Sequence, residues 1–415
     1  MGPAADAPNG ERVDLGNAAL LPGLVNAHTH LELTAMRGFL EELDFVTWIR
    51  TLTRARADVL DDARLLDAAR LGVVEGLAAG VTTFADTSAS GAPMRALIEA
   101  GARGIVFQEV FGPSPAQREE SMAGLRAAVA RLREIETPLV RVGVSPHAVY
   151  TVDEDLLLDA CAFAVGEGLP VAMHVSESRE ETDFLREASG PFADGLRARG
   201  IDVVRRAHSP VHLLVELGVA QVARPLLIHG VTFDPSDVHF VAEYGCPVAH
   251  CPASNAKLGH GVAPLVELLA AGAVVGLGSD SVASNNRMDI LDEARQAVLM
   301  QRARNGRHDV LAARQALELA TLGGARALGL DARVGSLEVG KEADLAAFRL
   351  EEPRGITAGH VEATLVYSLA GRTAALVAVA GRELVRDGRV LGVDPALAAR
   401  VAETTAALRA WATVA

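Results

Sequence analysis

The stretch LPGLVNAHTHLE, residues 21–32, decides the fold of this chain. Its apolar run begins with a Pro-Gly pair and ends on His28 and His30, which are two positions apart. Residues i and i+2 of a β-strand point to the same face, so both imidazoles can reach one metal ion if the run is a strand. Two histidines at this spacing also arise by chance, with one of them hydrogen-bonded in a core. The remainder of the chain separates these two interpretations.

Seven further strand-like runs follow, and helical patterns separate them. The eight runs cover residues 20–30, 81–87, 104–110, 140–149, 170–176, 225–231, 246–251 and 273–280. Apolar residues recur at helical spacing over residues 60–79, 116–135, 154–165 and 235–243. Eight strand–helix units in roughly 300 residues are typical of a (β/α)8 TIM barrel, and near-continuous apolar strands fit a covered parallel sheet. A doubly wound open sheet is the rival, but no glycine-rich dinucleotide fingerprint follows an early strand.

The sequence changes in character near residue 330. Short strands in hairpin-like spacing are predicted over residues 334–350, 363–369 and 374–391, with a turn at Gly381, and a helix over residues 395–413. We therefore expect four parts, which are a short N-terminal β-remnant over residues 1–20, the metal-dependent barrel over 21–330, a small β-domain over 331–393 and a helix over 394–415.

Charge and cysteine content restrict the partners and the compartment. The net charge is −14, which argues against a nucleic-acid or anionic-membrane partner because phosphate neutralisation needs a basic surface. Three cysteines form no disulfide framework. No signal peptide or membrane-spanning run is visible. A cytoplasmic protein with a small-molecule substrate is expected, and association into a homo-oligomer stays open.

Several later strand runs also end on titratable side chains. These are His174, His229, His250 and Asp280, with Glu177 three residues after the first of them. The C-terminal strand ends of a TIM barrel build its active site, and polar groups there are costly to bury without a purpose. Three imidazoles and one carboxylate suit a single divalent ion, Zn²⁺ or Fe²⁺, which lowers the pKa of a bound water.

Other candidate residues receive a plainer interpretation. Packing explains Cys246 and Cys251, because their spacing is a poor zinc pattern. Arg37, Arg50 and Arg54 follow the first strand and are expected on a solvated helix face rather than beside an anionic substrate. Six histidines in helical or loop contexts are expected to be surface or structural residues: His208, His212, His239, His260, His308 and His360.

Seven motifs in order resemble the amidohydrolase superfamily, and within it the aminohydrolase and chlorohydrolase branch. They are LPGLVNAHTHLE, GVTTFAD, SPHAVYT, HVSES, LIHGV, HCPASNAKLG and GLGSDSVASNN. The resemblance implies a barrel with a flanking β-sandwich built from both chain ends, whose N-terminal half is short or missing here. The branch includes adenosylhomocysteine and methylthioadenosine deaminases. FQEVFGP, SPHAVYT and the segment after HTH are more similar to the aminodeoxyfutalosine deaminase-like group.

The resemblance also implies roles for individual residues. Matched by position, His28, His30, His174 and Asp280 are metal ligands. Glu177 moves a proton to the ring nitrogen, His229 polarises the attacking water or the tetrahedral intermediate, and Asp280 takes the proton from water. Residues expected to contact substrate or shape its pocket are His147, His250 and Asn255, joined by Gln108 and Glu109 at the end of the third strand.

These roles predict hydrolytic deamination of an aminated purine-like ring or nucleoside, such as aminodeoxyfutalosine or an adenosine-type compound. Two-metal relatives carry a bridging carboxylated lysine on strand three or four, and neither Lys257 nor Lys341 lies there, so one ion is expected. The alternatives are a chlorohydrolase or other cyclic C–N hydrolase on the same site, and a non-catalytic metal-binding member of the fold.

Overall fold

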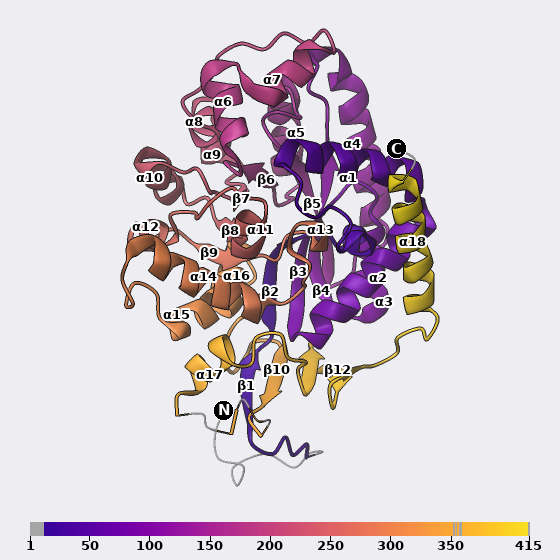
Figure 1. Ribbon diagram of the computed structural model, residues 1–415, viewed down its shortest axis with the longest axis vertical. Helices are drawn as coiled ribbons and strands as arrows, with labels where there is room; N and C mark the ends of the chain where they lie inside the picture. Colours follow the sequence, from indigo (N-terminus) through magenta and orange to yellow (C-terminus); the bar gives the residue numbers. More distant parts are fainter. Residues whose placement is uncertain (1–11, 352, 354, 357–358, 414–415) are drawn as a thin grey trace.

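The computed structural model describes residues 12–413 apart from 352, 354, 357 and 358. Eight parallel strands form a barrel from two four-stranded sheets, β2-β3-β4-β5 and β6-β7-β8-β9 (Figure 1). Their bounds are β2 (Leu24–Thr29), β3 (Val81–Ser88), β4 (Arg103–Val110), β5 (Val140–Pro146), β6 (Ala172–Val175), β7 (Leu226–His229), β8 (Val248–His250) and β9 (Val275–Leu277). Parallel bridges Val144–Val171 and Thr29–Asp280 join the two sheets and close the barrel. The predicted barrel is confirmed.

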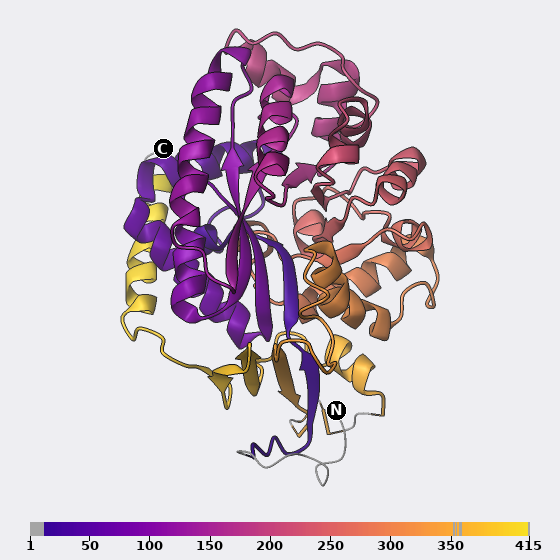
Figure 2. The same ribbon diagram turned by 180° about the vertical axis from the view of Figure 1, so that it is seen from behind.

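Helices cover the outside of the barrel, and the C-terminal helix returns to pack on α1 and α2 (Figure 2). The four predicted helices correspond to α2 (Asp62–Ala78), α4 (Arg118–Arg133), α5 (Glu154–Gly166) and α10 (Pro235–Tyr244). The other α-helices are α1 (Phe45–Val59), α3 (Ala92–Ala100), α6 (Arg179–Glu187), α7 (Gly190–Arg197), α8 (Pro210–Glu216), α9 (Val219–Val222), α11 (Pro252–Lys257), α12 (Leu265–Ala270), α13 (Val282–Asn285), α14 (Ile290–Asn305), α15 (Ala313–Glu318), α16 (Gly324–Ala327), α17 (Val361–Tyr367) and α18 (Leu397–Ala412).

The first predicted strand is two strands that belong to different sheets. β1 (Ala18–Pro22) pairs antiparallel with β10 (Leu345–Arg349), and β2 then enters the barrel beside β3. Gly23 lies between them, where a Cβ would be 2.1 Å from Thr82 Oγ1. The chain changes sheets at this Pro-Gly pair because only glycine permits such a close approach. Residues 1–11 of the predicted N-terminal remnant lie outside the described residues.

A five-stranded antiparallel sheet, β1-β10-β11-β12-β13, flanks the barrel. Its last three strands are β11 (Leu376–Val379), β12 (Arg382–Arg386) and β13 (Arg389–Val390), and the predicted turn at Gly381 joins the first two. Within the predicted run 334–350 only β10 is a strand. The predicted strand over residues 363–369 is wrong, because helix α17 occupies it and packs on α14 and α15. The period of a short apolar run is not enough to tell a strand from a segment of buried helix.

A buried ion pair connects the barrel to this sheet. Arg103 at the start of β4 donates from Nε and Nη2 to the two carboxylate oxygens of Asp344, both at 2.8 Å, and both side chains are 1% exposed. Asp344 also accepts a hydrogen bond from the backbone N–H of Ala380. The pair therefore holds together the start of a barrel strand and two segments of the flanking sheet.

We expect Asp344→Asn to lower the free energy of unfolding by about 3 kcal/mol, because it leaves the buried guanidinium with Glu342, 30% exposed on its side chain, as its remaining carboxylate partner. Asp387→Asn is the matched control, since Asp387 is 74% exposed and pairs with Arg349 at the surface. That change should cost less than about 1 kcal/mol. Urea unfolding of both variants measures the difference, and equal losses would contradict the assignment.

Within the described part of the chain, no helix combines the length and apolarity that a bilayer crossing requires.

Candidate metal-dependent active site

The C-terminal ends of β2, β6, β7 and β9 bring five titratable side chains together. His28 lies near the end of β2 and His30 directly follows it, His174 lies in β6, His229 ends β7 and Asp280 follows β9. Ligand atoms of His28, His174 and His229 lie within 4.8 Å of one another, as do those of His28, His30 and Asp280. The expected convergence of these side chains on one end of the barrel is therefore present.

Asp280 is the carboxylate at the centre of this group. Its Oδ1 lies 3.2 Å from His28 Nε2 and 3.6 Å from His30 Nε2. Its Oδ2 accepts hydrogen bonds from Ser254 Oγ at 2.5 Å and Ser284 Oγ at 2.7 Å. Oδ1 is thus directed at the imidazoles, while Oδ2 is fixed by the two hydroxyl donors. Residues that hydrogen-bond a metal ligand without binding the metal commonly orient that ligand in this way.

Hydrogen bonds to acceptors fix the orientation of three imidazoles. His30 Nδ1 lies 2.9 Å from the carbonyl oxygen of Thr87, and His174 Nδ1 lies 3.2 Å from that of His147. A carbonyl only accepts, so each Nδ1 carries the proton and each Nε2 keeps a lone pair for a metal. His229 Nδ1 is 3.0 Å from Asn255 Oδ1 and is held in the same way.

Burial favours the neutral form, which binds metal, for His28 and His174. It lowers the pKa of His28 to about 4 and places the pKa of His174 well below its usual value, with neighbouring imidazoles adding to the effect on His174. For Asp280, burial opposes ionisation, but the hydrogen bond from His28 and the surrounding imidazoles hold its pKa well below the usual range. A neutral histidine cluster around an ionised carboxylate is a donor set for a divalent cation.

The backbone at this end of the barrel adopts a conformation that non-glycine residues rarely take. His229 has φ 79°, Asp280 φ 56° and Ser176 φ 55°. Each falls in the left-handed region, which costs free energy for residues with a Cβ. Such strain persists where the surrounding structure imposes it, often at functional sites. Here it sets the direction of two of the converging side chains.

Glu177 lies beside this donor set without belonging to its centre. Its Oε1 is 3.6 Å from His229 Nε2 and 3.7 Å from His260 Nε2. Burial raises its pKa well above the usual value, and the negative charge of Asp280 adds to this rise. A carboxyl whose pKa is raised by burial is better suited to donate a proton to a substrate than an ordinary glutamate.

His260 is a residue of this site that sequence reasoning assigned to the surface or to structure. Its side chain is 4% exposed, and no described group hydrogen-bonds its Nε2. Burial lowers its pKa to about 4. The available signal was its position immediately after HCPASNAKLG, because the turn that follows α11 directs it back towards Glu177.

A cavity of about 460 Å³ opens next to the donor set. Predicted site residues that line it are His30, Glu109, His147, His174, Glu177, His229 and Asp280. Three predicted pocket residues do not line it. Asn255 instead holds His229, Gln108 Nε2 donates to the carbonyl of Ala89, and His250 is buried with no partner among the described residues.

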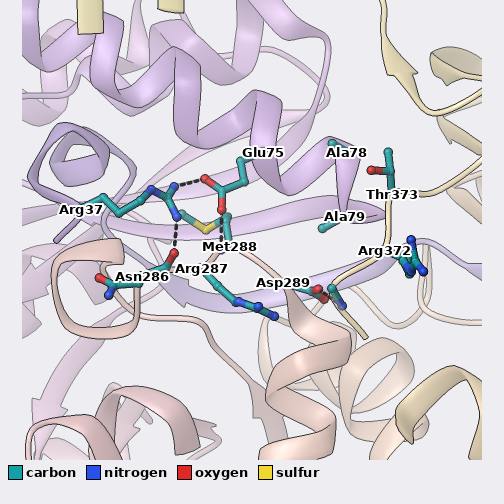
Figure 3. A pocket seen from close by; sticks show the side chains of 11 residues that line it. Arg37, Glu75, Ala78, Ala79, Asn286, Arg287, Met288, Asp289, Arg372 and Thr373 are labelled. Carbon is teal, nitrogen blue, oxygen red and sulfur yellow. Dashed lines mark hydrogen bonds and ion pairs between the residues drawn. The ribbon is translucent and has the colours of Figure 1, made fainter. Parts of the chain in front are cut away.

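The arginines after the first strand lie apart from this cavity, as expected. Arg37 lines a second hollow of about 370 Å³, where it donates to Glu75 and to the carbonyl of Asn286 (Figure 3). Glu75 in turn accepts from the backbone N–H of Met288. Arg54 lies over the Trp411 ring at 5.6 Å. Arg56 alone among the described arginines lines the active-site cavity.

Glu181, a buried carboxyl on helix α6, hydrogen-bonds the backbone of Glu177. Its Oε2 accepts the backbone N–H of Glu177 at 2.9 Å, and burial raises its pKa from 4.5 to about 8. The folded chain therefore holds this proton more tightly than the unfolded chain does. Between pH 4.5 and 8 this group lowers the free energy of unfolding of the protein as pH rises, by at most about 1.4 kcal/mol per pH unit.

Glu181→Gln should remove this contribution, so the free energy of unfolding should fall less steeply from pH 5 to 8. Urea unfolding at several pH values, at fixed metal content, measures the slope. Glu187→Gln on the same helix is the control, because Glu187 is exposed and should leave the slope unchanged. Identical slopes for the Glu181 variant and the parent chain would refute the assignment.

A barrel with a His/Asp donor set at its C-terminal face defines a class of metal-dependent hydrolases. The chain belongs to the amidohydrolase family, whose model matches residues 19–384. It is 33% identical over 399 residues to the 5-methylthioadenosine/S-adenosylhomocysteine deaminase of Moorella thermoacetica, covering 95% of this chain and 89% of that protein.

Solved structures of similar fold include two zinc-bound proteins. One is an adenosine deaminase from Xanthomonas campestris, with a TM-score of 0.84, 30% identity and coverage of 95% of this chain and 87% of that one. The other is the atrazine chlorohydrolase of Arthrobacter aurescens, with a TM-score of 0.80, 26% identity and coverage of 94% and 88%. The predicted family resemblance is confirmed, and a divalent metal site agrees with these zinc-bound neighbours.

Proposed function

We propose that this protein is an aminohydrolase that replaces the amino group of an adenosine-type nucleoside by oxygen and releases ammonia. The observation that carries the proposal is the position of Glu177, a buried carboxyl whose pKa is raised by burial, at the edge of a His/Asp donor set and open to the same cavity. Deamination of an aromatic amidine requires a proton on the ring nitrogen as the nucleophile adds. The similarity to deaminases of methylthioadenosine and adenosine supports the same choice.

The residues present fit one divalent ion. His28, His30, His174 and Asp280 would hold it, because His28 shares one cluster of ligand atoms with His30 and Asp280 and another with His174, and burial lowers the pKa of His28 and His174. Nitrogen and oxygen donors of this kind suit Zn²⁺ and Fe²⁺, and the zinc-bound neighbours favour zinc. When bound, such an ion supplies a water of lowered pKa near neutral pH.

The chain's own residues divide the remaining work. Asp280 accepts a proton from the attacking water, and Glu177 donates its carboxyl proton to the ring nitrogen. As the C–N bond breaks, Asp280 passes its proton to the amino group, which leaves as ammonia, and Glu177 regains a proton from the new hydroxyl group. His229, whose Nδ1–H is held by Asn255 Oδ1, presents its Nε2 lone pair and polarises the attacking water by accepting a hydrogen bond from it. His147 and Glu109 line the cavity beside His174 and contact the substrate.

Ammonia release from 5′-methylthioadenosine, adenosine and aminodeoxyfutalosine, with zinc- and iron-loaded protein, tests this function. We expect turnover of at least one compound, loss of turnover after chelation, and recovery when the metal is returned. No ammonia from any of them with metal-loaded protein would contradict it. Chloride release from a chlorotriazine would instead favour the chlorohydrolase alternative, for which the triazine-hydrolysing neighbour is the support.

The three cysteines are free and buried. Unpaired thiols are typical of a reducing compartment, so we propose a cytoplasmic location.

A further inference from the structure

One face of helix α1 forms part of the wall of the active-site cavity. Residues 45, 48, 49, 52, 53, 56 and 57 line the cavity, at the three- and four-residue spacing that places them along one side of a helix. Phe45, Trp48, Ile49 and Leu52 make the first two turns of this face apolar. Phe111, after β4, lines the same cavity and leaves 43% of its surface exposed. Apolar surface left open in a cavity is typical of a binding site for an apolar group.

The cationic side chain that lines this cavity, Arg56, already pairs with a carboxylate. Arg56 is the one arginine or lysine among the described residues of the lining. Its Nε and Nη2 donate to Glu32 Oε1 at 3.2 and 2.7 Å. Glu32 is 4% exposed on its side chain and also accepts from Ser88 Oγ at 2.6 Å. If Arg56 moved to a substrate anion, a buried carboxylate would lose its counter-charge, which is costly.

The other charged groups of the lining are carboxylates. Glu109 faces the cavity beside the Glu32–Arg56 pair, and no described group donates a hydrogen bond to its Oε1. Asp280 and Glu177 line the same cavity, and Glu109 itself lies beside His147 and His174, with their ligand atoms within 4.8 Å of one another. A carboxylate on the substrate would therefore meet no arginine or lysine among the described residues of this lining other than Arg56, which Glu32 already engages.

We propose that this enzyme selects adenosine-type nucleosides with an apolar 5′ substituent, which packs on Phe45, Trp48, Ile49 and Leu52, over those with a charged aminoacyl tail. The proposal rests on the proposed function, because the reacting ring carbon must lie at the donor set with its neighbouring nitrogen at Glu177. The sugar and its 5′ substituent then extend into the remaining volume, which α1 and Phe111 border.

The test compares kcat/KM for deamination of 5′-methylthioadenosine and S-adenosylhomocysteine. We expect the parent enzyme to favour the methylthio compound by at least about tenfold, since a charged group replaces an apolar one in an apolar pocket. Leu52→Arg, and Ile49→Arg as a second variant, should reduce that ratio by at least about tenfold, because each adds a cation beside the tail. Thr51→Arg is the control, since Thr51 does not line the cavity. An equal or higher kcat/KM for S-adenosylhomocysteine with the parent enzyme would overturn the proposal.

Binding of the 6-oxo products separates this proposal from the proposed function. Calorimetry of 5′-methylthioinosine and S-inosylhomocysteine needs no turnover, and tighter binding of the methylthio product is expected. Equal or tighter binding of the homocysteine product would contradict the selectivity even in an active deaminase. Absence of turnover with both nucleosides, while the products bind in the expected order, would contradict the deaminase function and leave the apolar subsite supported.

Discussion

Glu177→Gln is expected to lower kcat by about 10²–10⁴-fold while the protein keeps its metal and its fold. The substitution preserves shape but removes the proton that the ring nitrogen requires. Glu177 is outside the centre of the donor set, with its Oε1 3.6 Å from His229 Nε2, so the metal ligands stay in place. Steady-state deamination rates, metal content by mass spectrometry and a thermal melt measure the three parts of this expectation.

A matched control shows whether the effect belongs to this carboxyl. Glu187→Gln makes the same chemical change on helix α6, at an exposed position paired with Arg205. It should leave kcat within about twofold, as surface changes usually do. A near-native rate for Glu177→Gln, or an equal loss in the control, would remove the proton-transfer role.

Asp280→Asn is expected to impair metal retention and turnover together. The change removes the charge that attracts the cation and the base that accepts the proton of the attacking water. Asp280 also joins the two barrel sheets, since its backbone N–H donates to the His28 carbonyl, so a thermal melt must accompany the assay. Zinc titration and deamination rates measure the two losses, and full occupancy at an unchanged rate would contradict the assignment.

A milder variant and its control test the same metal site without changing Asp280 itself. Ser284→Ala removes one of the two hydroxyls that fix Asp280 Oδ2, and we expect about 10–100-fold weaker metal binding. Asp292→Asn on α14 is the control, because Asp292 pairs with Arg287 away from the donor set. It should bind metal as the parent protein does.

The barrel was predictable because its signals are local. Apolar runs of strand length alternate with helical periods, and parallel strands in a closed barrel carry their C-terminal ends to one face. That rule alone brings His28, His174 and Asp280 together from three distant parts of the chain. The roles assigned to them stay predictions, whereas their convergence is a feature of the structure.

The errors in the prediction have equally local causes. The run over residues 20–30 changes sheets at Gly23, and no periodicity marks such a change. The apolar segment at residues 363–369 becomes α17 because α14 and α15 offer it a helical packing surface. Whether a short apolar segment forms a strand or a helix depends on the elements it packs against.

The sequence by itself determined the barrel and most of the side chains that meet at its C-terminal face, because strand period and parallel topology follow from residue order. The family followed separately from the resemblance of seven ordered motifs. Only the tertiary structure decided that His260 turns back to Glu177, that Asn255 acts through His229, and that Arg56 is engaged by Glu32. These contacts join loops and helices distant in sequence, and their distances depend on how whole elements pack.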